Sequence, residues 1–528
     1  MTINSMSFLV FFLGIAIVYY LPFLKKYQWA VLLVASYLFY FFAGTDNFIY
    51  ILVTTMTTHF SARMIGRKNK QQEEWLREGK GRRTKEETAG YKARIKSEKN
   101  RIVFFDIAVN IGLLIFVKYS NFFIFNINRI VTLESNIELK ALNILIPLGI
   151  SYYTLQSIGY VLDVWKGKTQ AEENLLKTAL FVSYFPQITQ GPIGRFAKLA
   201  PQLFGVHRFS WQNLSFGCQR ILWGFFKKAV IADRMNSFVD EIFLHYEQHS
   251  GFTLFLGCIY FSIQAYADFS AYMDIASGYS QILGIGLEEN FKRPFFSQSL
   301  AEYWRRWHIT LSSWFRDYLF YPLSLSAPAV KLSRIGRKYL PARIAKLVPS
   351  VYAMFLVWFA TGFWHDASWR YILWGVANGV IMISSMCLSE QFQTWKEKLH
   401  IREENKFWQF FRRLRTFLLI SLLKVFPAAS STGNSLRILK KIVTDFRIEL
   451  SYQAWFPGLI KNYLAYISFG LILFLMVGIK QEKEPFREYM EKKPFAFRWC
   501  LYVIILCAIL SFGMFGTGLS GGFEYAQY

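Results

Sequence analysis

The sequence predicts an all-helical, polytopic membrane protein, and its composition and charge pattern lead to this fold class. Of its 528 residues, 53% are hydrophobic and 19% aromatic, and the mean hydropathy is +0.24. A soluble chain is usually about 45–50% apolar, so this composition suits a protein in lipid, with Trp and Tyr at the headgroups. The net charge of +25 gathers between apolar stretches, which favours a membrane protein over a nucleic-acid-binding, secreted disulfide-rich or disordered one.

A membrane span needs about 20 mostly apolar residues. The candidate stretches are residues 6–24, 28–43, 46–62, 102–120, 142–162, 174–190, 215–232, 252–268, 270–287, 347–365, 369–389, 414–427, 463–479 and 497–515. Several are short or carry polar residues, which is typical of re-entrant or protein-buried segments. We therefore expect about 11–13 membrane-embedded helices. No Lys or Arg and no small-residue cleavage site accompany the first stretch, so we expect a retained span and not a signal peptide.

Clusters of Lys and Arg predict which loops face the cytoplasm. Residues 63–101 hold 14 Lys or Arg and 6 Asp or Glu, and further basic clusters occupy residues 25–26, 324–350 and 480–498. With these on the cytoplasmic side, the loops near Thr45–Asp46 and Glu134–Glu138 face outward, as do the N-terminus and residues 521–528. The mixed signs of residues 63–101 favour an exposed charged helix near anionic lipid heads over a nucleic-acid arm.

The most unusual stretch is 290–323, where charged residues and tryptophans interrupt apolar sequence. Charges facing lipid here would cost several kcal/mol each, so the segment either lies at the interface as an amphipathic helix or lines a polar cavity. On one continuous helix, the residues sharing a face are Trp304, Trp307, His308 and Leu311. The neighbouring face carries Arg305, Ser312 and Arg316, and Arg316 is next to its compensating acid, Asp317.

A second polar segment joins two apolar spans at Trp364 and His365. The preceding basic loop is expected in the cytoplasm, so the span at residues 347–365 runs outward and His365 lies toward the outer half of the protein. The chain has seven His, and His308 and His365 both lie in Trp-flanked, polar-rich segments. An ionisable group within a membrane is a functional candidate; a structural hydrogen-bonding role is the alternative.

Two further features interrupt apolar sequence. Asp268 and Asp274 are expected to pair with Arg305, Arg306 or Arg316 inside the bundle, either as structural ion pairs or in catalysis. The Gly191–Pro192 pair breaks a helix, either beside a cavity or in a plain loop. The sequence carries no nucleotide-binding loop, hydrolase elbow or metal-ligand spacing, so an ATP-driven pump, a soluble-type hydrolase and a metal site are not expected.

These motifs resemble those of the membrane-bound O-acyltransferases. The run ENFKRPFFSQSLAEYWRRWHITLSSWFRDYLFYPL and the later FWHDASWRYILWG are similar to the bacterial branch of alginate O-acetyltransferase membrane subunits and teichoic-acid D-alanyl transferases. FVSYFPQITQGPIGRF, LWGFFKKAVIADR and QAYADFSAYMDIASG resemble the same branch, in the same order. The resemblance covers about residues 1–380. It implies a membrane core at residues 1–390 that carries the basic loop 63–101, and a C-terminal helical extension with further membrane helices at residues 391–528.

The resemblance implies a tunnel through the membrane, with His365 as the catalytic base and His308 as the second functional histidine. The donor would be a cytoplasmic thioester, acetyl-coenzyme A or an acyl-carrier thioester, with no bound cofactor. The acceptor would be an outer hydroxyl, on a polysaccharide or on a secreted partner that relays the acyl group. His308, Trp304 and Trp307 would shape the tunnel or polarise the thioester carbonyl. The other residues expected along the tunnel are Arg305, Arg306 and Arg316, which would hold donor phosphates, and Ser312, Trp314, Asp317, Asp268, Asp274 and Trp364.

The family resemblance also implies a multi-pass protein of a bacterial plasma membrane, working with cell-wall or exopolysaccharide machinery, membrane lipids and an acyl carrier protein. The chain departs from the family's usual motifs at Pro322–Ser326, at Asp366 after His365, and at Leu423–Ala429. These departures concern the partner surface and the acceptor class more than the core reaction. Three alternatives stay open: D-alanyl transfer to teichoic acid, acylation of a lipid, and a non-enzymatic exporter of glycolipid or polysaccharide.

Overall fold

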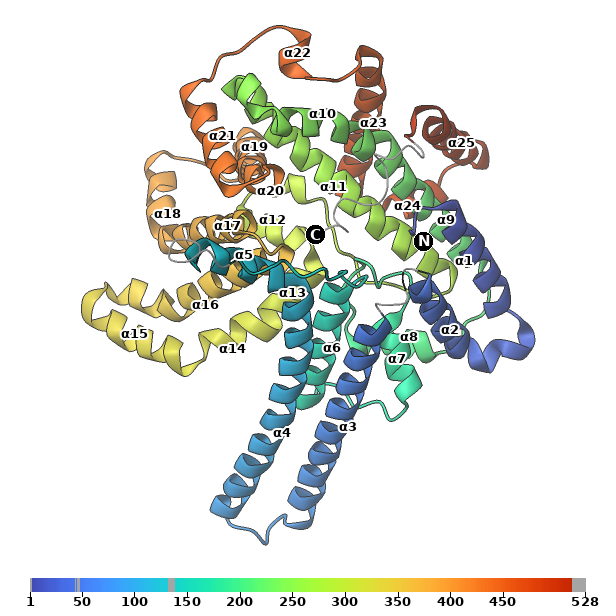
Figure 1. Cartoon of the computed structure of the whole chain (residues 1–528), viewed down its shortest axis with the longest axis vertical. Coiled ribbons are helices and arrows are strands. Elements are labelled where there is room, and N and C mark those ends of the chain that lie inside the picture. Colours follow the sequence, from blue (N-terminus) through green and yellow to red (C-terminus); the bar gives the residue numbers. More distant parts are fainter. Residues whose placement is uncertain (1, 43, 45–47, 132–137, 515–528) are drawn as a thin grey trace. The chain divides into compact units, whose positions relative to one another are not determined.

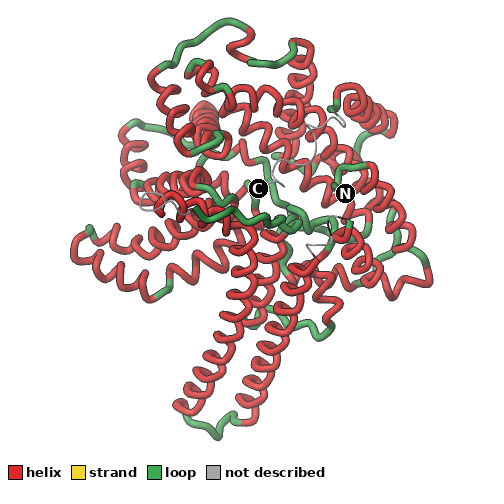
Figure 2. The backbone as a smooth tube through the Cα atoms, viewed as in Figure 1, coloured by secondary structure: helices red, strands yellow, loops and turns green. Residues whose placement is uncertain are grey.

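The protein is helical throughout the part of the chain that the structure describes. The computed structural model covers residues 2–42, 44, 48–131 and 138–514 (Figure 1). Helices make up 78% of it, and these residues form no β-strand beyond one isolated antiparallel bridge between Phe291 and Trp307 (Figure 2). The predicted all-helical class is therefore confirmed. The expected outward loops at residues 45–46 and 134–137, and the expected outward residues 521–528, lie outside the described residues.

The chain forms two compact units. The first contains residues 1–217 and 276–288, and the second contains residues 218–275 and 289–528. The first unit contains α1 (Met6–Tyr19), η1 (Pro22–Tyr27), α2 (Gln28–Phe41), α3 (Phe48–Glu78), α4 (Lys85–Leu114), η3 (Ile115–Tyr119), α5 (Ser120–Val131), α6 (Ile150–Trp165), α7 (Leu175–Ser183) and α8 (Phe196–Phe204). Two helices contribute residues to both units, α9 (Trp211–Phe226) and α11 (Gly251–Ile282).

In the first unit, α3 and α4 lie side by side as a long hairpin (Figure 1). The Thr84 hydroxyl caps α4 by accepting from the Glu87 backbone N–H, and the Glu87 carboxylate accepts in return from the Thr84 N–H. The rings of Trp75 and Tyr91 stack at 4.0 Å across the hairpin. The charged stretch at residues 63–101 is therefore helical, as predicted, on both sides of a turn at residues 79–84, and its cytoplasmic location stays a prediction.

The interruption predicted at Gly191–Pro192 is present but begins earlier, so the pair lies inside a loop and does not itself break a helix. Helix α7 ends at Ser183, well before the end of the expected span at 174–190, and no helix follows until α8. The intervening loop is mostly buried, and the Gln156 Oε1 atom accepts from the Gln187 side chain and from the Gly194 N–H, both at 2.9 Å. A buried side-chain amide thus satisfies backbone that the break leaves without helical partners.

The remaining helices belong to the second unit. They are η4 (Lys227–Ala232), α10 (Asp233–Leu244), η5 (Tyr246–Gln248), η6 (Pro294–Phe296), α12 (Leu300–Arg306), α13 (Ile309–Phe315), η7 (Arg316–Phe320), α14 (Tyr321–Ser324), α15 (Ala327–Tyr339), α16 (Ala342–His365), α17 (Trp369–Cys387), α18 (Ser389–Lys398), α19 (Lys406–Leu423), α20 (Val425–Ala428), α21 (Thr432–Thr444), α22 (Tyr452–Trp455), α23 (Lys461–Gln481), α24 (Phe486–Glu491) and α25 (Phe495–Phe512).

Glycines allow α16 and α17 to pack closely. A Cβ atom on Gly362 would meet the carbonyl oxygen of Tyr371, and one on Gly375 would meet the carbonyl oxygen of Trp358. Small residues of this kind let two helix backbones approach within the membrane. This packing fixes the end of α16, where His365 is the last helical residue.

Within the described ranges, five helices are long and apolar enough to cross a membrane. They are Lys85–Val131, Gly251–Ile282, Ala342–His365, Lys461–Gln481 and Phe495–Phe512. Two bent pairs, Met6–Tyr19 with Pro22–Phe41 and Trp369–Cys387 with Ser389–Lys398, raise the number to seven if each pair is one span. The predicted division between spans 252–268 and 270–287 is wrong: both belong to α11, because its polar side chains are buried without breaking the helix. The expected 11–13 embedded helices stay a prediction.

Candidate active site

His308 lies where the chain breaks between α12 and α13, and the predicted continuous helix across this region is wrong. Helix α12 ends at Arg306, Trp307 is extended, and His308 has a left-handed backbone with φ 46° and ψ 54°. The break occurs because the chain pairs here with an upstream segment: the Ile309 N–H donates to the Asn290 carbonyl oxygen at 3.0 Å. His308 and Trp307 therefore do not share the helical face that a 3.6-residue period predicts.

The Asn290 side chain holds the His308 ring. Its Oδ1 atom accepts from the Thr310 N–H at 3.0 Å and from the Thr310 hydroxyl at 2.9 Å, and it lies 3.2 Å from His308 Nδ1. Because Oδ1 can only accept, Nδ1 carries the proton of the neutral ring and Nε2 keeps its lone pair. Burial lowers the pKa of His308, which lies outside the five apolar helices, to about 3, so the ring is neutral at pH 7.

Sequence reasoning did not select Asn290 as a site residue. It precedes His308 by 18 residues, and the two meet through irregular backbone that has no sequence period. Charged residues flank Asn290 on both sides (Glu288, Glu289, Lys292 and Arg293), so its local sequence gave no signal that this amide is buried.

Tryptophan rings connect the two predicted catalytic histidines. The ring centroid of Trp364 is 6.3 Å from that of His308 and 5.1 Å from that of His365. The Trp374 ring is 5.2 Å from His365 and 5.6 Å from Trp304. Both histidines are at most 5% exposed. The structure thus brings together the two histidines and a set that we call the tryptophan cluster: Trp304, Trp307, Trp364 and Trp374.

The three arginines predicted to bind the donor, Arg305, Arg306 and Arg316, face solvent or pair with carboxylates. Arg306 forms ion pairs with Glu302 at 2.8 Å and with Glu482 at 2.9 Å. Arg305 is exposed, and the exposed Arg316 pairs with Asp317 at 3.0 Å, so that predicted internal compensation is confirmed. None of these three arginines contacts the tryptophan cluster through any interaction recorded between described residues.

Two other predicted tunnel residues have local roles in the segment after His308. The Ser312 hydroxyl donates to the Trp307 carbonyl oxygen at 3.4 Å, which helps to close the break. Trp314 is buried, and its ring packs against Phe315 and Tyr318 at 5.5 and 5.2 Å. These contacts support the chain that presents His308.

The predicted partners of Asp268 and Asp274 are wrong, although both carboxylates do form ion pairs. Asp268 pairs with Lys228 at 2.8 Å, and Asp274 pairs with Lys227 at 2.7 Å and Arg220 at 2.9 Å. The cations come from α9 and η4, not from the 305–316 segment. Basic residues within the apolar run LWGFFKKAVIADR were the signal that could have identified them.

Close helix packing explains this pairing. A Cβ atom on Gly224 of α9 would meet the Ala271 carbonyl oxygen and the Ile275 side chain of α11. Arg220 lies one turn before Gly224, and Lys227 and Lys228 lie one turn after it, so all four share a face. The glycine lets α9 approach α11 and brings its cations against the buried carboxylates.

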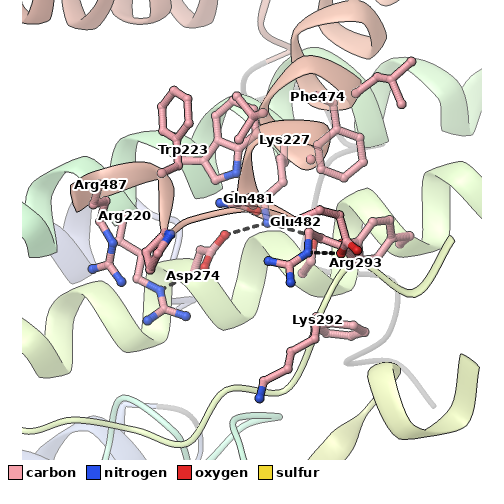
Figure 3. Close-up of a pocket in the computed structure, with 18 of the residues that line it drawn as sticks. Arg220, Trp223, Lys227, Asp274, Lys292, Arg293, Phe474, Gln481, Glu482 and Arg487 are labelled. Carbon is pink, nitrogen blue, oxygen red and sulfur yellow. Dashed lines mark hydrogen bonds and ion pairs between the residues drawn. The ribbon is translucent and has the colours of Figure 1, made fainter. Parts of the chain in front are cut away.

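A cavity of about 870 Å³ lies beside Asn290 in the second unit (Figure 3). Its walls combine aromatic side chains, such as Trp223 and Phe474, with charged groups. The labelled basic and acidic groups are Arg220, Lys227, Asp274, Lys292, Arg293, Glu482 and Arg487, and Glu482 forms ion pairs with both Arg293 and Arg306. Since Asn290 lines this cavity and also holds His308, one side chain connects the cavity to the tryptophan cluster.

The cavity draws on two parts of the sequence. One wall comes from α9, η4, α11 and residues 289–296, and the other comes from α23, α24, α25 and the turn at residues 481–487. Mixed basic and apolar walls of this size suit an elongated ligand with anionic and apolar parts.

The family model and the similar proteins found by comparison agree with one another. The model of the membrane-bound O-acyltransferase family matches residues 172–336, which include His308. The probable alginate O-acetylase AlgI of Pseudomonas putida is 33% identical over 381 residues, covering 72% of this chain and 70% of that protein. The corresponding Pseudomonas aeruginosa protein is 32% identical over 380 residues, and the match spans only 65% of its length.

Other relatives are named for other acceptor polymers. The peptidoglycan O-acetyltransferase of Helicobacter pylori is 31% identical over 361 residues, covering 63% of each chain. The teichoic acid D-alanyltransferase of Bacillus subtilis is 28% identical over 264 residues, covering 48% of this chain and 62% of that protein. The expected resemblance is confirmed by the family match and by the extent of the AlgI alignments. This chain belongs to the membrane-bound O-acyltransferase family.

Proposed function

We propose that the protein is a membrane O-acyltransferase that moves an acetyl group from a thioester donor to a hydroxyl on the opposite side of the membrane. The observation that carries this proposal is the pair of buried histidines joined by the tryptophan cluster, with a charged and aromatic cavity beside them. The relatives named as O-acetylases and O-acetyltransferases support the same reaction.

His365 acts as the general base in this mechanism. As the acceptor oxygen attacks the thioester carbonyl carbon, the hydroxyl proton moves to His365 and a C–O bond forms. The tetrahedral intermediate then collapses, the C–S bond breaks, and the thiolate takes up the proton from His365, which restores the base. A positioned base contributes about 10²–10⁴-fold to the rate. The tryptophan cluster keeps water away from the thioester, which suppresses hydrolysis.

His308 serves as an acceptor and not as a donor. Its Nδ1 proton is directed at Asn290, so Nε2 has no proton to donate to a thioester carbonyl. This arrangement supports the shaping role expected for His308 over polarisation of the carbonyl. The ring orients the donor or the acceptor hydroxyl through its Nε2 lone pair.

The donor occupies the cavity beside Asn290. Arg220, Lys227 and Arg293 there are the proposed cations for donor phosphates, which would displace the carboxylates that now pair with these residues, Asp274, Glu289 and Glu482. The aromatic walls suit an apolar thioester arm. The turn at residues 481–487 belongs to the basic cluster expected on the cytoplasmic side, where acetyl-coenzyme A or an acyl-carrier thioester would be available. These cations replace Arg305, Arg306 and Arg316 as the proposed donor contacts.

The acceptor is a cell-envelope polysaccharide, reached directly or through a secreted partner protein. The alginate and peptidoglycan relatives support a polysaccharide acceptor. The protein would work in a bacterial plasma membrane, with N- and C-termini outside, next to polysaccharide machinery. D-alanyl transfer is the second candidate, because the Bacillus subtilis relative is named for it.

The test measures ester groups that mild base releases from cell-envelope polysaccharide. Cells carrying wild-type protein, His365→Ala or no protein are compared at matched membrane levels. Acetate released only with the wild type supports the proposal, whereas D-alanine would transfer the assignment to teichoic-acid modification. Equal ester in all three strains would refute acyl transfer and favour the exporter, and labelled lipid would favour lipid acylation.

A further inference from the structure

One buried lysine has no place in the mechanism described so far. Lys424 lies where α19 ends and α20 begins, and its backbone N–H donates to the carbonyl oxygens of Ile420 and Ser421 at 3.2 and 3.1 Å. The residue is 6% exposed. Helix α19 packs against α12, which ends directly before Trp307, and α20 packs against α17, which carries Trp374 (Figure 1).

The ammonium of Lys424 lies against the tryptophan cluster. Its Nζ atom is 4.8 Å from the ring centroid of Trp307 and 5.8 Å from that of Trp374. Trp307 directly precedes His308, and the Trp374 ring contacts His365. A cation over the faces of two indoles is held by their quadrupoles, which places a positive charge beside one ring that contacts His365 and beside the residue that precedes His308.

This lysine differs from the other buried lysines of the chain. Three lysines are buried in the part of the protein that the structure describes: Lys227, Lys228 and Lys424. Lys227 has a carboxylate at 2.7 Å, and Lys228 has two at 2.8 Å. No carboxylate of the described residues pairs with Lys424. A buried ammonium without a counter-ion is costly, so its position suits a step in which negative charge arrives or develops nearby.

The proposed reaction produces negative charge of this kind. The tetrahedral intermediate carries it on the former carbonyl oxygen, and an acyltransferase needs a donor or cation for that oxyanion. His308 cannot supply the donor, because its one proton is on Nδ1 and directed at Asn290. Arg305, Arg306 and Arg316 are turned to solvent or to other carboxylates.

We propose that Lys424 stabilises the oxyanion by donating an N–H from its ammonium to the former carbonyl oxygen. This inference rests on the proposed acyl transfer. Lys424 keeps its proton throughout: the acceptor proton goes to His365, the new C–O bond replaces the C–S bond, and the oxyanion returns to a carbonyl when the thiolate leaves. Lys424 lies outside the family-matched segment at residues 172–336 and inside Leu423–Ala429, so this assignment brings into the core reaction a segment whose departure from the family motif was expected to concern the partner surface.

The charge of Lys424 is also sensitive to pH. Burial lowers the pKa of Lys424, which lies outside the five apolar helices, to about 8. The ammonium is therefore present below pH 8 and is lost as the pH rises through that value. Two titratable side chains contact the Trp307 ring, Tyr266 and Tyr303, and His308 follows Trp307 in sequence. The Trp374 ring contacts His365 and Tyr371.

The experiment compares wild type, Lys424→Met and Lys424→Arg in full-length protein reconstituted in vesicles. Labelled acetyl-coenzyme A is the donor, and the readout is base-labile label on added cell-envelope polysaccharide, measured between pH 6 and 10. We expect Lys424→Met to lower kcat by about 10²–10³-fold, the loss typical of an oxyanion donor, with a KM change below about threefold. Lys461→Met is the matched control, since it removes an exposed lysine beside the Tyr452 ring.

The pH profile separates charge from packing. Wild-type kcat should fall above pH 8, and in Lys424→Arg this decline should disappear because arginine stays charged. A kcat within threefold of wild type in Lys424→Met, or an unchanged alkaline decline in Lys424→Arg, would overturn the inference. Should Lys424→Met fail to fold, the arginine profile decides alone. Loss of transfer in His365→Ala with full transfer in Lys424→Met refutes only the lysine role, whereas no acetyl transfer by wild type refutes the proposed function itself.

Discussion

The Asn290 side chain offers the sharpest test of how the site is held together. Asn290 is 2% exposed, and its Oδ1 atom is the acceptor for the Thr310 N–H, the Thr310 hydroxyl and His308 Nδ1. Asn290→Ala removes all of these hydrogen bonds and leaves buried donors behind. At about 1 kcal/mol net for each bond, the loss is about 3 kcal/mol. His308 also holds a left-handed backbone at φ 46°, which costs about 1–2 kcal/mol in a residue with a Cβ.

We expect Asn290→Ala to lower acetyl transfer by about 10²-fold, because about 1.4 kcal/mol corresponds to a tenfold change in rate. The assay is base-labile acetate on polysaccharide per folded protein, together with a thermal melt of the purified protein. Asn110→Ala is the control: Asn110 is also buried, and it donates to the Asp106 carbonyl oxygen at 2.9 Å within α4 of the first unit, whereas both histidines belong to the second unit. It should lower the melting temperature without lowering transfer per folded molecule.

The reasoning fails if Asn290→Ala keeps more than half of the wild-type transfer rate with an unchanged melting temperature. It also fails if Asn110→Ala lowers transfer per folded protein as strongly as Asn290→Ala, since the effect would then reflect general stability.

Three further predictions address the cavity, the ion pairs and the helix packing. Gly478→Phe places a ring in the wall of the proposed donor cavity and should raise KM for acetyl-coenzyme A at least tenfold. The control, Gly112→Phe, lies in open space on α4 and should leave KM unchanged. Equal KM values in the two variants would show that the donor does not bind in this cavity. Lys228→Met leaves the buried Asp268 and the partly exposed Asp233 without their shared cation and should destabilise the protein by about 3–5 kcal/mol, measured by thermal or denaturant unfolding; an unchanged melt would contradict the pairing. Gly362→Ala should push α16 from α17 and lower both stability and transfer, whereas Gly14→Ala, which meets no neighbour, should be neutral in the same assays.

The sequence allowed the helical class to be predicted, because hydropathy is a local property, while the catalytic role of the two histidines stays a prediction. It did not allow the path of the chain between them to be predicted. The helical period through Trp307 and His308 was overridden by hydrogen bonds to Asn290, whose position depends on folding. Likewise, Asp268 pairs with Lys228 and not with the arginines of the 305–316 segment, because a glycine lets α9 approach α11. Such choices depend on packing between distant segments, which periodicity does not encode.

The two walls of the cavity beside Asn290 come from distant parts of the sequence. The wall formed by α9, α11 and residues 289–296 lies within the family-matched segment at 172–336, whereas α23–α25 lie far beyond it. A chain shortened after residue 390 would lose both the second wall and Lys424. If the donor occupies this cavity, as proposed, substitutions in α23–α25 change the donor wall without changing the two histidines. The contacts to the donor and the chemistry at the histidines would then be encoded in separate parts of the chain.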